Sequence, residues 1–201
     1  VPFSLYEATN DRIWLIGRIG YVYSVDIGAR EWTTYTGLNF QCETDDGVQW
    51  FSSNHGGAVV SQNRQTGEWV QYGQDDQLID EVKGITVTHH GLVWAVGSHG
   101  HQAAFSVFNG TRWTRFVHPR FLRRIEPNAV LEASDGTVWL GGGGSVSAEI
   151  PHAGGVLQYR VNEDDTLELI KHHQPPDFPY YVTALTQGVD GTIWIGSSQI
   201  Y

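Results

Sequence analysis

Short stretches of alternating apolar and polar residues recur along the chain. Residues 85–88, 129–132 and 182–185 each place an apolar side chain at every second position. A period of two residues is typical of a half-buried β-strand, because successive side chains of a strand point to opposite faces of the sheet. Since no segment sustains an apolar period of 3.6 residues, the sequence predicts a structure that is almost entirely β.

A turn and a strand that carries a tryptophan follow each of these stretches. The turn is Asp-Gly in three of the five copies, and this pair is expected to supply both positive-φ positions of a tight hairpin. The tryptophans recur at spacings of 36, 44, 45 and 55 residues, near the length at which a four-stranded propeller blade repeats. The five copies are those of Trp14, Trp50, Trp94, Trp139 and Trp194.

Each of the first three units carries two further landmarks. A glycine stands six positions after its tryptophan, and a second tryptophan follows 18 or 19 positions after it. The fourth unit matches if residues 143–153 carry a nine-residue insertion, which aligns Gly154-Gly155 with Gly56-Gly57 and puts Leu167 in place of the second tryptophan. The landmarks are Gly20, Gly56 and Gly100, then Trp32, Trp69 and Trp113.

The landmarks divide each unit into four strands. The alternating stretch is the first strand and the tryptophan phrase the second; the third strands are expected at 21–26, 58–63, 103–108 and 156–161, and the fourth around the second tryptophan. We therefore predict an all-β fold, a single β-propeller of four-stranded antiparallel blades, with the five repeated tryptophans packed between blades. The expected repeats are 1–39, 40–80, 81–127, 128–179 and 180–201, about four and a half blades of a larger propeller. A small ring closed by mixed strands is the alternative.

The best-preserved copies resemble a known repeat. The phrase Asp-Gly-Thr-(Ile/Val)-Trp-(Ile/Leu)-Gly, followed by Gly-Gly-Val and Tyr159, is similar to the two-component regulator propeller repeat, and more distantly to virginiamycin B lyase-like propellers. The resemblance implies a periplasmic or extracellular sensor module, with neighbouring propeller or signalling domains of the same parent chain as partners. The repeat motif is structural, so it implies the architecture and not a binding site.

Composition and charge narrow the partners. A formal charge of −10 argues against a nucleic-acid surface, for which a basic stripe is expected. No apolar run approaches 18 residues, so the segment is not expected to span a membrane. The single cysteine, Cys42, excludes an intramolecular disulfide and is expected to be buried. An incomplete ring has unpaired sheet edges that can pair with another chain, so a homodimer is possible from the sequence.

The irregular segments are predicted to gather on one side of the propeller. The loops between second and third strands, and the linkers between blades, open on what we term the loop face; the tight turns open on the opposite turn face. The insertion at 143–153 and the linkers 73–80, 118–127 and 172–179 all belong to the loop face. Because long loops on a rigid scaffold carry binding and catalysis, this face is the expected functional surface.

Histidines, arginines and a tyrosine on this face are the candidate ligand contacts. Guanidinium groups pair with carboxylate or sulfate, so the arginines are consistent with an acidic oligosaccharide; solvated linker charges or an interdomain contact explain them equally well. No compact His/Cys spacing indicates zinc, and neither a metal nor another cofactor is expected. The candidates are Asn54, His55, His99, His101, Arg120, Arg123, Arg124, Glu149, His152 and Tyr180.

Two functions are consistent with these residues. The first is a non-enzymatic sensor whose loop face binds an oligosaccharide or a partner domain; it is favoured because no catalytic constellation is evident in the sequence. The second is a virginiamycin B lyase-like enzyme, in which His55 or His99 is the general base and a metal stabilises the developing anion.

Overall fold

The structure is a computed structural model. It describes residues 4–8, 12–17, 21–53, 57–122, 124–143, 154–164, 166–174 and 176–197, with the side chains of residues 8 and 119–122 left out. Within these ranges the regular structure is eighteen β-strands and one short 3₁₀-helix, η1 (Gln74–Asp76). None of the described helices is long and apolar enough to cross a membrane.

The strands form five antiparallel sheets that follow one another along the chain. Four sheets have four strands in sequential order and the last has two, so the predicted partial β-propeller is confirmed. We term them blades 1 to 5. Blade 1 is β1 (Ser4–Ala8), β2 (Arg12–Ile16), β3 (Tyr21–Asp26) and β4 (Glu31–Thr36); blade 2 is β5 (Leu38–Glu43), β6 (Val48–Ser53), β7 (Val59–Asn63) and β8 (Trp69–Tyr72); blade 3 is β9 (Glu81–Val87), β10 (Val93–His99), β11 (Gln102–Phe108) and β12 (Trp113–Leu122); blade 4 is β13 (Ile125–Glu132), β14 (Thr137–Gly142), β15 (Val156–Val161) and β16 (Leu167–His173); blade 5 is β17 (Val182–Gln187) and β18 (Ile193–Ser197).

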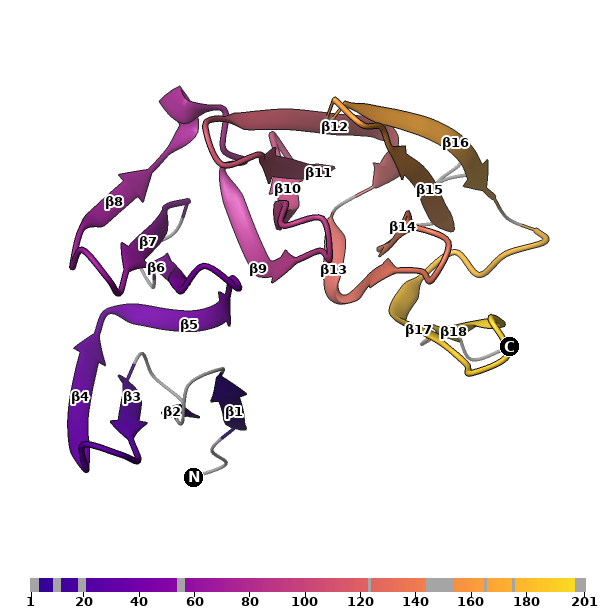
Figure 1. The fold of residues 1–201 in the computed structure, drawn as a ribbon. Coiled ribbons are helices and arrows are strands. Elements are labelled where there is room, and N and C mark those ends of the chain that lie inside the picture. The colour runs from indigo at the N-terminus through magenta and orange to yellow at the C-terminus, as the bar shows by residue number, and fades with distance from the viewer. Residues whose placement is uncertain are drawn as a thin grey trace.

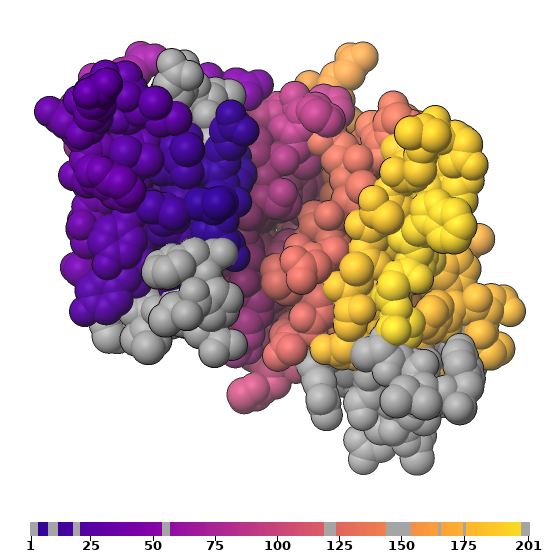
Figure 2. Space-filling model, turned by 90° about the horizontal axis from the view of Figure 1, so that it is seen from below, coloured from indigo at the N-terminus to yellow at the C-terminus, as the bar shows by residue number. Residues whose placement is uncertain are grey.

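The blades are arranged as an open arc (Figure 1). The first strand of each blade, β1, β5, β9, β13 or β17, lies on the inner side of the arc, and the fourth strand lies on the outer side. Figure 2, seen from the open side, shows blade 1 in indigo and blade 5 in yellow, with blades 3 and 4 between them. Side chains at the starts of successive inner strands are therefore neighbours around the axis of the arc.

The repeated tryptophan joins consecutive blades. Trp14 is fully buried and stacks on Phe40 of blade 2 at 4.0 Å between ring centroids, and Trp50 meets Trp113 of blade 3 at 5.7 Å. Trp94 belongs to an apolar cluster shared with blade 4, and Trp139 to one shared with blade 5. The predicted packing between blades is wrong for Trp194, which is 63% exposed. Its face of blade 5 has no sheet against it among the described residues.

The turn between the first two strands differs from the predicted hairpin. Only the glycine is left-handed, with φ of 82° at Gly47 and 78° at Gly136, while the preceding aspartates have negative φ. The amide of Gly47 donates to the carbonyl of Thr44, so the loop is a type I turn followed by one left-handed glycine. This three-residue loop needs one positive φ instead of two.

Two predicted segments have different boundaries. Residues 118–122 and 125–127, expected to be part of a linker, belong to β12 and β13, and the register of β11 with β12 shifts between Gln102 and Ala103. Both strands lie at sheet edges, where the prolines at 119 and 127 are tolerated. In blade 4, strand register makes Leu169 the counterpart of Trp69, and Gly154 that of Gly57, so the insertion is one residue shorter than predicted.

Cys42 is buried on the inner strand β5, as predicted. Its side chain packs in the cluster between blades 2 and 3. Burial raises the pKa of its thiol to about 12, so the group remains protonated and unreactive at neutral pH.

Candidate functional site

A row of charged and phenolic side chains follows the starts of the inner strands of blades 3, 4 and 5. Lys83 Nζ lies 2.5 Å from Glu81 Oε1 in β9. Arg124 Nε donates to Glu126 Oε1 at 2.8 Å, and the Tyr181 hydroxyl donates to the same oxygen at 2.6 Å. We term these five residues the axial rim. They lie on the loop face because each inner strand begins there.

The axial rim is electrostatically balanced. The hydrogen bonds from Lys83 and then from Ser98 lower the pKa of Glu81, with a smaller contribution from the charge of Arg124 in the next blade. The hydrogen bond to Glu126 raises the pKa of both Arg124 and Tyr181. The rim therefore combines two basic and two acidic side chains, which pair with each other.

A hollow of about 380 Å³ adjoins the rim between blades 2 and 3. Gln41 fixes one wall: its amide donates to Ser52 Oγ at 3.2 Å, and its carbonyl accepts the backbone N–H of Ile85 at 3.2 Å. Amide and hydroxyl groups therefore continue the polar surface toward blade 2. The lining residues are Asn39, Gln41, Ser52, Ser53, Gly57, Glu81, Val82 and Lys83.

His99 ends β10 and is engaged by its neighbours. Arg115 Nη1 lies 2.7 Å from Nε2 and 3.2 Å from Nδ1 of the ring, and the backbone N–H of Asp80 points to Nδ1 at 3.3 Å. Its side chain is 27% exposed. His101 is exposed at the tip of the β10–β11 hairpin, where its own φ is 64°. Neither histidine is part of the axial rim.

The other sequence candidates are distributed unevenly. Arg124 lies in the axial rim, where Glu126 occupies its Nε. Tyr180 is partly buried, and its carbonyl approaches Gly154 so closely that a Cβ there would clash; Gly154 has φ of 101°. Arg120 lies in β12, but its side chain is outside the described residues. Five candidates lie wholly outside them: Asn54, His55, Arg123, Glu149 and His152.

Sequence reasoning missed four of the five rim residues. Glu81, Lys83 and Glu126 look like solvated charges at the ends of linkers, and Tyr181 looks like the start of a strand. The available signal was their shared position at the start of the first strand in successive repeats. Among the residues that the structure describes, no three His, Cys, Asp or Glu side chains are placed to hold a metal ion.

The turn face has a larger hollow, of about 530 Å³, at the ends of the inner strands of blades 1 to 3. Asp45, Asp46 and His89 in its wall belong to the tight turns of the repeat. Because those turns recur in successive blades, the hollow follows from the fold itself, and we place the candidate site at the axial rim.

Comparisons with known proteins support the fold. No protein-family model matches the chain, and no curated protein sequence does. Among solved structures, the extracellular domain of a protein described as a hybrid two component system from B. thetaiotaomicron is similar, with a TM-score of 0.65 and 17% identity over 96% of this chain and 26% of that one. The extracellular domain of a protein described as a one component system from the same organism gives 0.62 and 12% over 96% and 24%.

A third similar structure is virginiamycin B lyase from Staphylococcus aureus, with a TM-score of 0.59 and 14% identity over 98% of this chain and 63% of the lyase. These neighbours match the family that the repeats resemble. At such identities the likeness concerns the fold alone. The chain spans about a quarter of the length of the two extracellular domains.

Proposed function

We propose that this chain is a ligand-binding propeller module of an extracellular sensor, and that it acts without catalysis. The axial rim is the observation that carries the proposal: paired charges and a phenol lie at the starts of the inner strands of three successive blades. A hydrogen bond joins blades 4 and 5, and the charge of Arg124 acts on Glu81 of blade 3. Ligand bound there contacts blades 3, 4 and 5 together, so occupancy is coupled to the angles between blades. The sensor role and the extracellular location are suggested by the similar structures.

The proposed ligand class is a neutral oligosaccharide. Every described charge of the axial rim has an opposite partner, so the rim offers no excess charge to an acidic sugar. The adjoining hollow is lined by the amides of Asn39 and Gln41 and the hydroxyl of Ser52, whose chemistry suits the hydroxyl groups of a sugar, and the Gln41–Ser52 hydrogen bond holds two of these groups in place. The sequence-based hypothesis assigned acidic sugar recognition to the cluster of Arg120, Arg123 and Arg124. Of these side chains the structure describes that of Arg124, and Glu126 already neutralises its guanidinium.

A lyase function is less consistent with the described residues. His99, the candidate general base within them, has donors within hydrogen-bond distance of both ring nitrogens. A general base must accept a proton from substrate, and here the guanidinium of Arg115 occupies the ring. We therefore propose binding as the role of the loop face.

Isothermal titration calorimetry with maltohexaose and with hexagalacturonate tests the ligand class. We expect binding of the neutral sugar and at least a tenfold loss of affinity in Lys83→Met and Tyr181→Phe, about 1.4 kcal/mol for one lost hydrogen bond to a charged or phenolic group. Lys171→Met, at the exposed outer strand β16, is the matched control and should bind normally. Binding of hexagalacturonate alone, or equal affinity in all variants, would refute the axial rim as a neutral-sugar site.

A further inference from the structure

Buried polar atoms without partners are concentrated between blades 1 and 2. Within the part of the chain that the structure describes, nine such side-chain atoms occur, and six belong to this interface. The other three are indole nitrogens of Trp50, Trp94 and Trp113. The six are Arg12 Nε, Trp14 Nε1, Glu43 Oε2, Gln49 Nε2, Gln49 Oε1 and Gln62 Oε1.

Strand register brings these groups into one layer. Gln49 is the Cα partner of Glu43 on one side and of Gln62 on the other, so the three side chains share a face of blade 2. Phe51, two residues after Gln49, lies on that face and contacts Trp14 of blade 1 at 5.8 Å. Arg12, two residues before Trp14, therefore faces the same layer.

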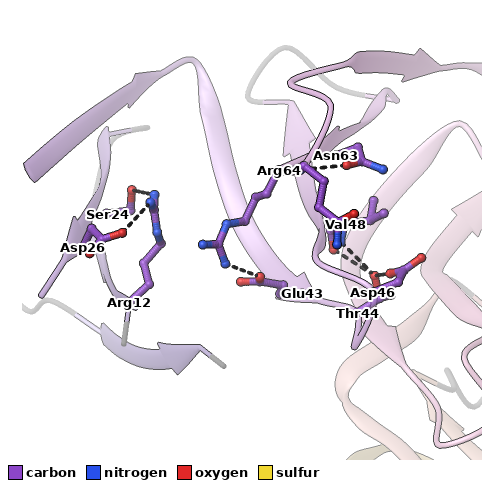
Figure 3. Close-up of polar contacts among 10 residues, drawn as sticks. Arg12, Ser24, Asp26, Glu43, Thr44, Asp46, Val48, Asn63 and Arg64 are labelled. Carbon is purple, nitrogen blue, oxygen red and sulfur yellow. Dashed lines mark hydrogen bonds and ion pairs between the residues drawn. The ribbon is translucent and has the colours of Figure 1, made fainter. Parts of the chain in front are cut away.

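The ion pairs of the layer are shown in Figure 3. Arg12 reaches Ser24 Oγ at 3.0 Å and Asp26 Oδ2 at 3.4 Å within blade 1, and Arg64 Nη1 reaches Glu43 Oε1 at 2.9 Å within blade 2. We term Arg12, Ser24, Asp26, Glu43, Gln49, Gln62 and Arg64 the polar layer. Each arginine has its own carboxylate, so the formal charges of the layer sum to zero.

The repeat shows that the interfaces between blades 2 and 3 and between blades 3 and 4 lack the two central residues of this layer. At the position of Arg12, blades 2 and 3 have Val48 and Leu92; at the position of Gln49, blades 3 and 4 have Val93 and Val138. Apolar residues therefore face each other between blades 2 and 3 and between blades 3 and 4. Between blades 1 and 2 both sides are polar, as expected if Arg12 and Gln49 bind a common occupant.

Burial makes the unpaired groups costly. Gln49 is fully buried, and the side chain of Glu43 is 2% exposed. Native proteins satisfy nearly all buried polar atoms with protein groups or with ordered water. A cluster of six unsatisfied atoms at one interface therefore points to an occupant.

The chemistry of the six atoms selects the occupant. Three of the atoms are donors: Arg12 Nε, Trp14 Nε1 and Gln49 Nε2. The other three are acceptors: Glu43 Oε2, Gln62 Oε1 and Gln49 Oε1. A cation would leave the donors unsatisfied, and an anion would face the acceptors. Water both donates and accepts, and a layer of zero net charge does not demand an ion.

We propose that the polar layer is an internal hydration site, in which ordered water bridges Arg12 of blade 1 to Glu43, Gln49 and Gln62 of blade 2. A buried water typically makes about three hydrogen bonds, so the atoms present are sufficient for one or two waters. The water joins the two blades at the level where other blades use apolar contacts.

A crystal structure of the whole chain, grown without halide, tests the occupant directly. We expect density for a water within hydrogen-bond distance of the Gln49 amide and of at least one of the other polar side chains. Direct pairing of Gln49 with Arg12 or Gln62 would overturn the proposal. So would density that refines as an ion.

The stability of Gln49→Met gives an independent test, because a dry and a hydrated interface predict changes of opposite sign in the midpoint of urea unfolding. In a dry interface, methionine removes an unpaired amide and raises the midpoint of urea unfolding. In a hydrated interface, it deprives the water and its other partners of hydrogen bonds, so we expect a lower midpoint. Gln71→Met, exposed on β8 of the same blade, should leave the midpoint unchanged. A raised midpoint in Gln49→Met contradicts internal hydration, and the wild-type crystal decides if this variant does not fold.

Discussion

The interface between blades 1 and 2 and that between blades 3 and 4 solve the same packing problem differently. Between blades 3 and 4, the ring of Phe105 lies 5.1 Å from Trp94 and 5.4 Å from Tyr159 in one continuous apolar cluster. Between blades 1 and 2, an aromatic cluster around Trp14 gives way to the polar layer toward the turn face.

The difference shows which part of the repeat is constrained. The tryptophan is present in both interfaces, and so is an aromatic or aliphatic residue opposite it. The positions one and two residues before the tryptophan vary from apolar to charged. The blade geometry is therefore set by the tryptophan level, and the turn end of each interface is free to carry another chemistry.

Truncation at the centre of the apolar interface should have the largest effect. Phe105→Ala removes a fully buried ring that contacts Trp94, Phe116 and Tyr159, and we expect a loss of about 4 kcal/mol of unfolding free energy. Urea denaturation followed by tryptophan fluorescence measures it. Phe105→Leu, which retains most of the volume, should cost about 1 kcal/mol. Equal, small losses in both variants would show that this interface is loosely packed.

Breaking the ion pair between Arg64 and Glu43 in the polar layer should have the next largest effect. Arg64→Met leaves the buried carboxylate of Glu43 without its cation, and we expect a loss of about 3 kcal/mol. The double variant Arg64→Met, Glu43→Gln should recover most of this loss, because the uncompensated charge is gone. If the double variant is as unstable as the single one, the arginine contributes through packing and not through charge.

Acidification should destabilise the interface between blades 3 and 4. Burial, and then the charge of His172, lower the pKa of His118 to about 4, and its Nε2 meets the hydroxyl of Tyr159. Because the unfolded histidine has the higher pKa, it binds a proton first, and stability is lost as the pH falls from about 6.5 toward 4. The expected loss at pH 4.5 is on the order of 2 kcal/mol.

The pH dependence has a matched control. His118→Gln should weaken the dependence of unfolding free energy on pH between pH 6.5 and 4.5, whereas His101→Asn, at an exposed left-handed turn position, should retain it. The same acid loss in wild type and His118→Gln would assign it to other groups.

Much of the fold was predictable from local pattern. The predicted third strands at 21–26 and 156–161 coincide with β3 and β15, because alternation and flanking turns are local signals. The long β12 and β13 were not predicted, because Pro119 and Pro127 are read locally as linker residues, and their tolerance depends on the position of each strand at a sheet edge. Trp194 shows the same limit: its burial depends on a neighbouring sheet.

The candidate site was predictable only in part. The sequence placed Arg124 and the segment around Tyr180 on the loop face, which is where they lie. It did not predict the ion pairs of Arg124 with Glu126 and of Lys83 with Glu81, although each joins residues only two apart. It also did not predict that these pairs belong to one rim, because their common position depends on how blades 3, 4 and 5 stack.

The sequence by itself determined the strands, their order and the tryptophan spacing, since these follow from side-chain alternation, turn glycines and a repeat that each blade satisfies locally. Only the tertiary structure decided which side chains meet. Tyr181 and Glu126, or Trp14 and Phe40, become neighbours because successive sheets stack around an axis, and that stacking brings together side chains that are tens of residues apart in the chain.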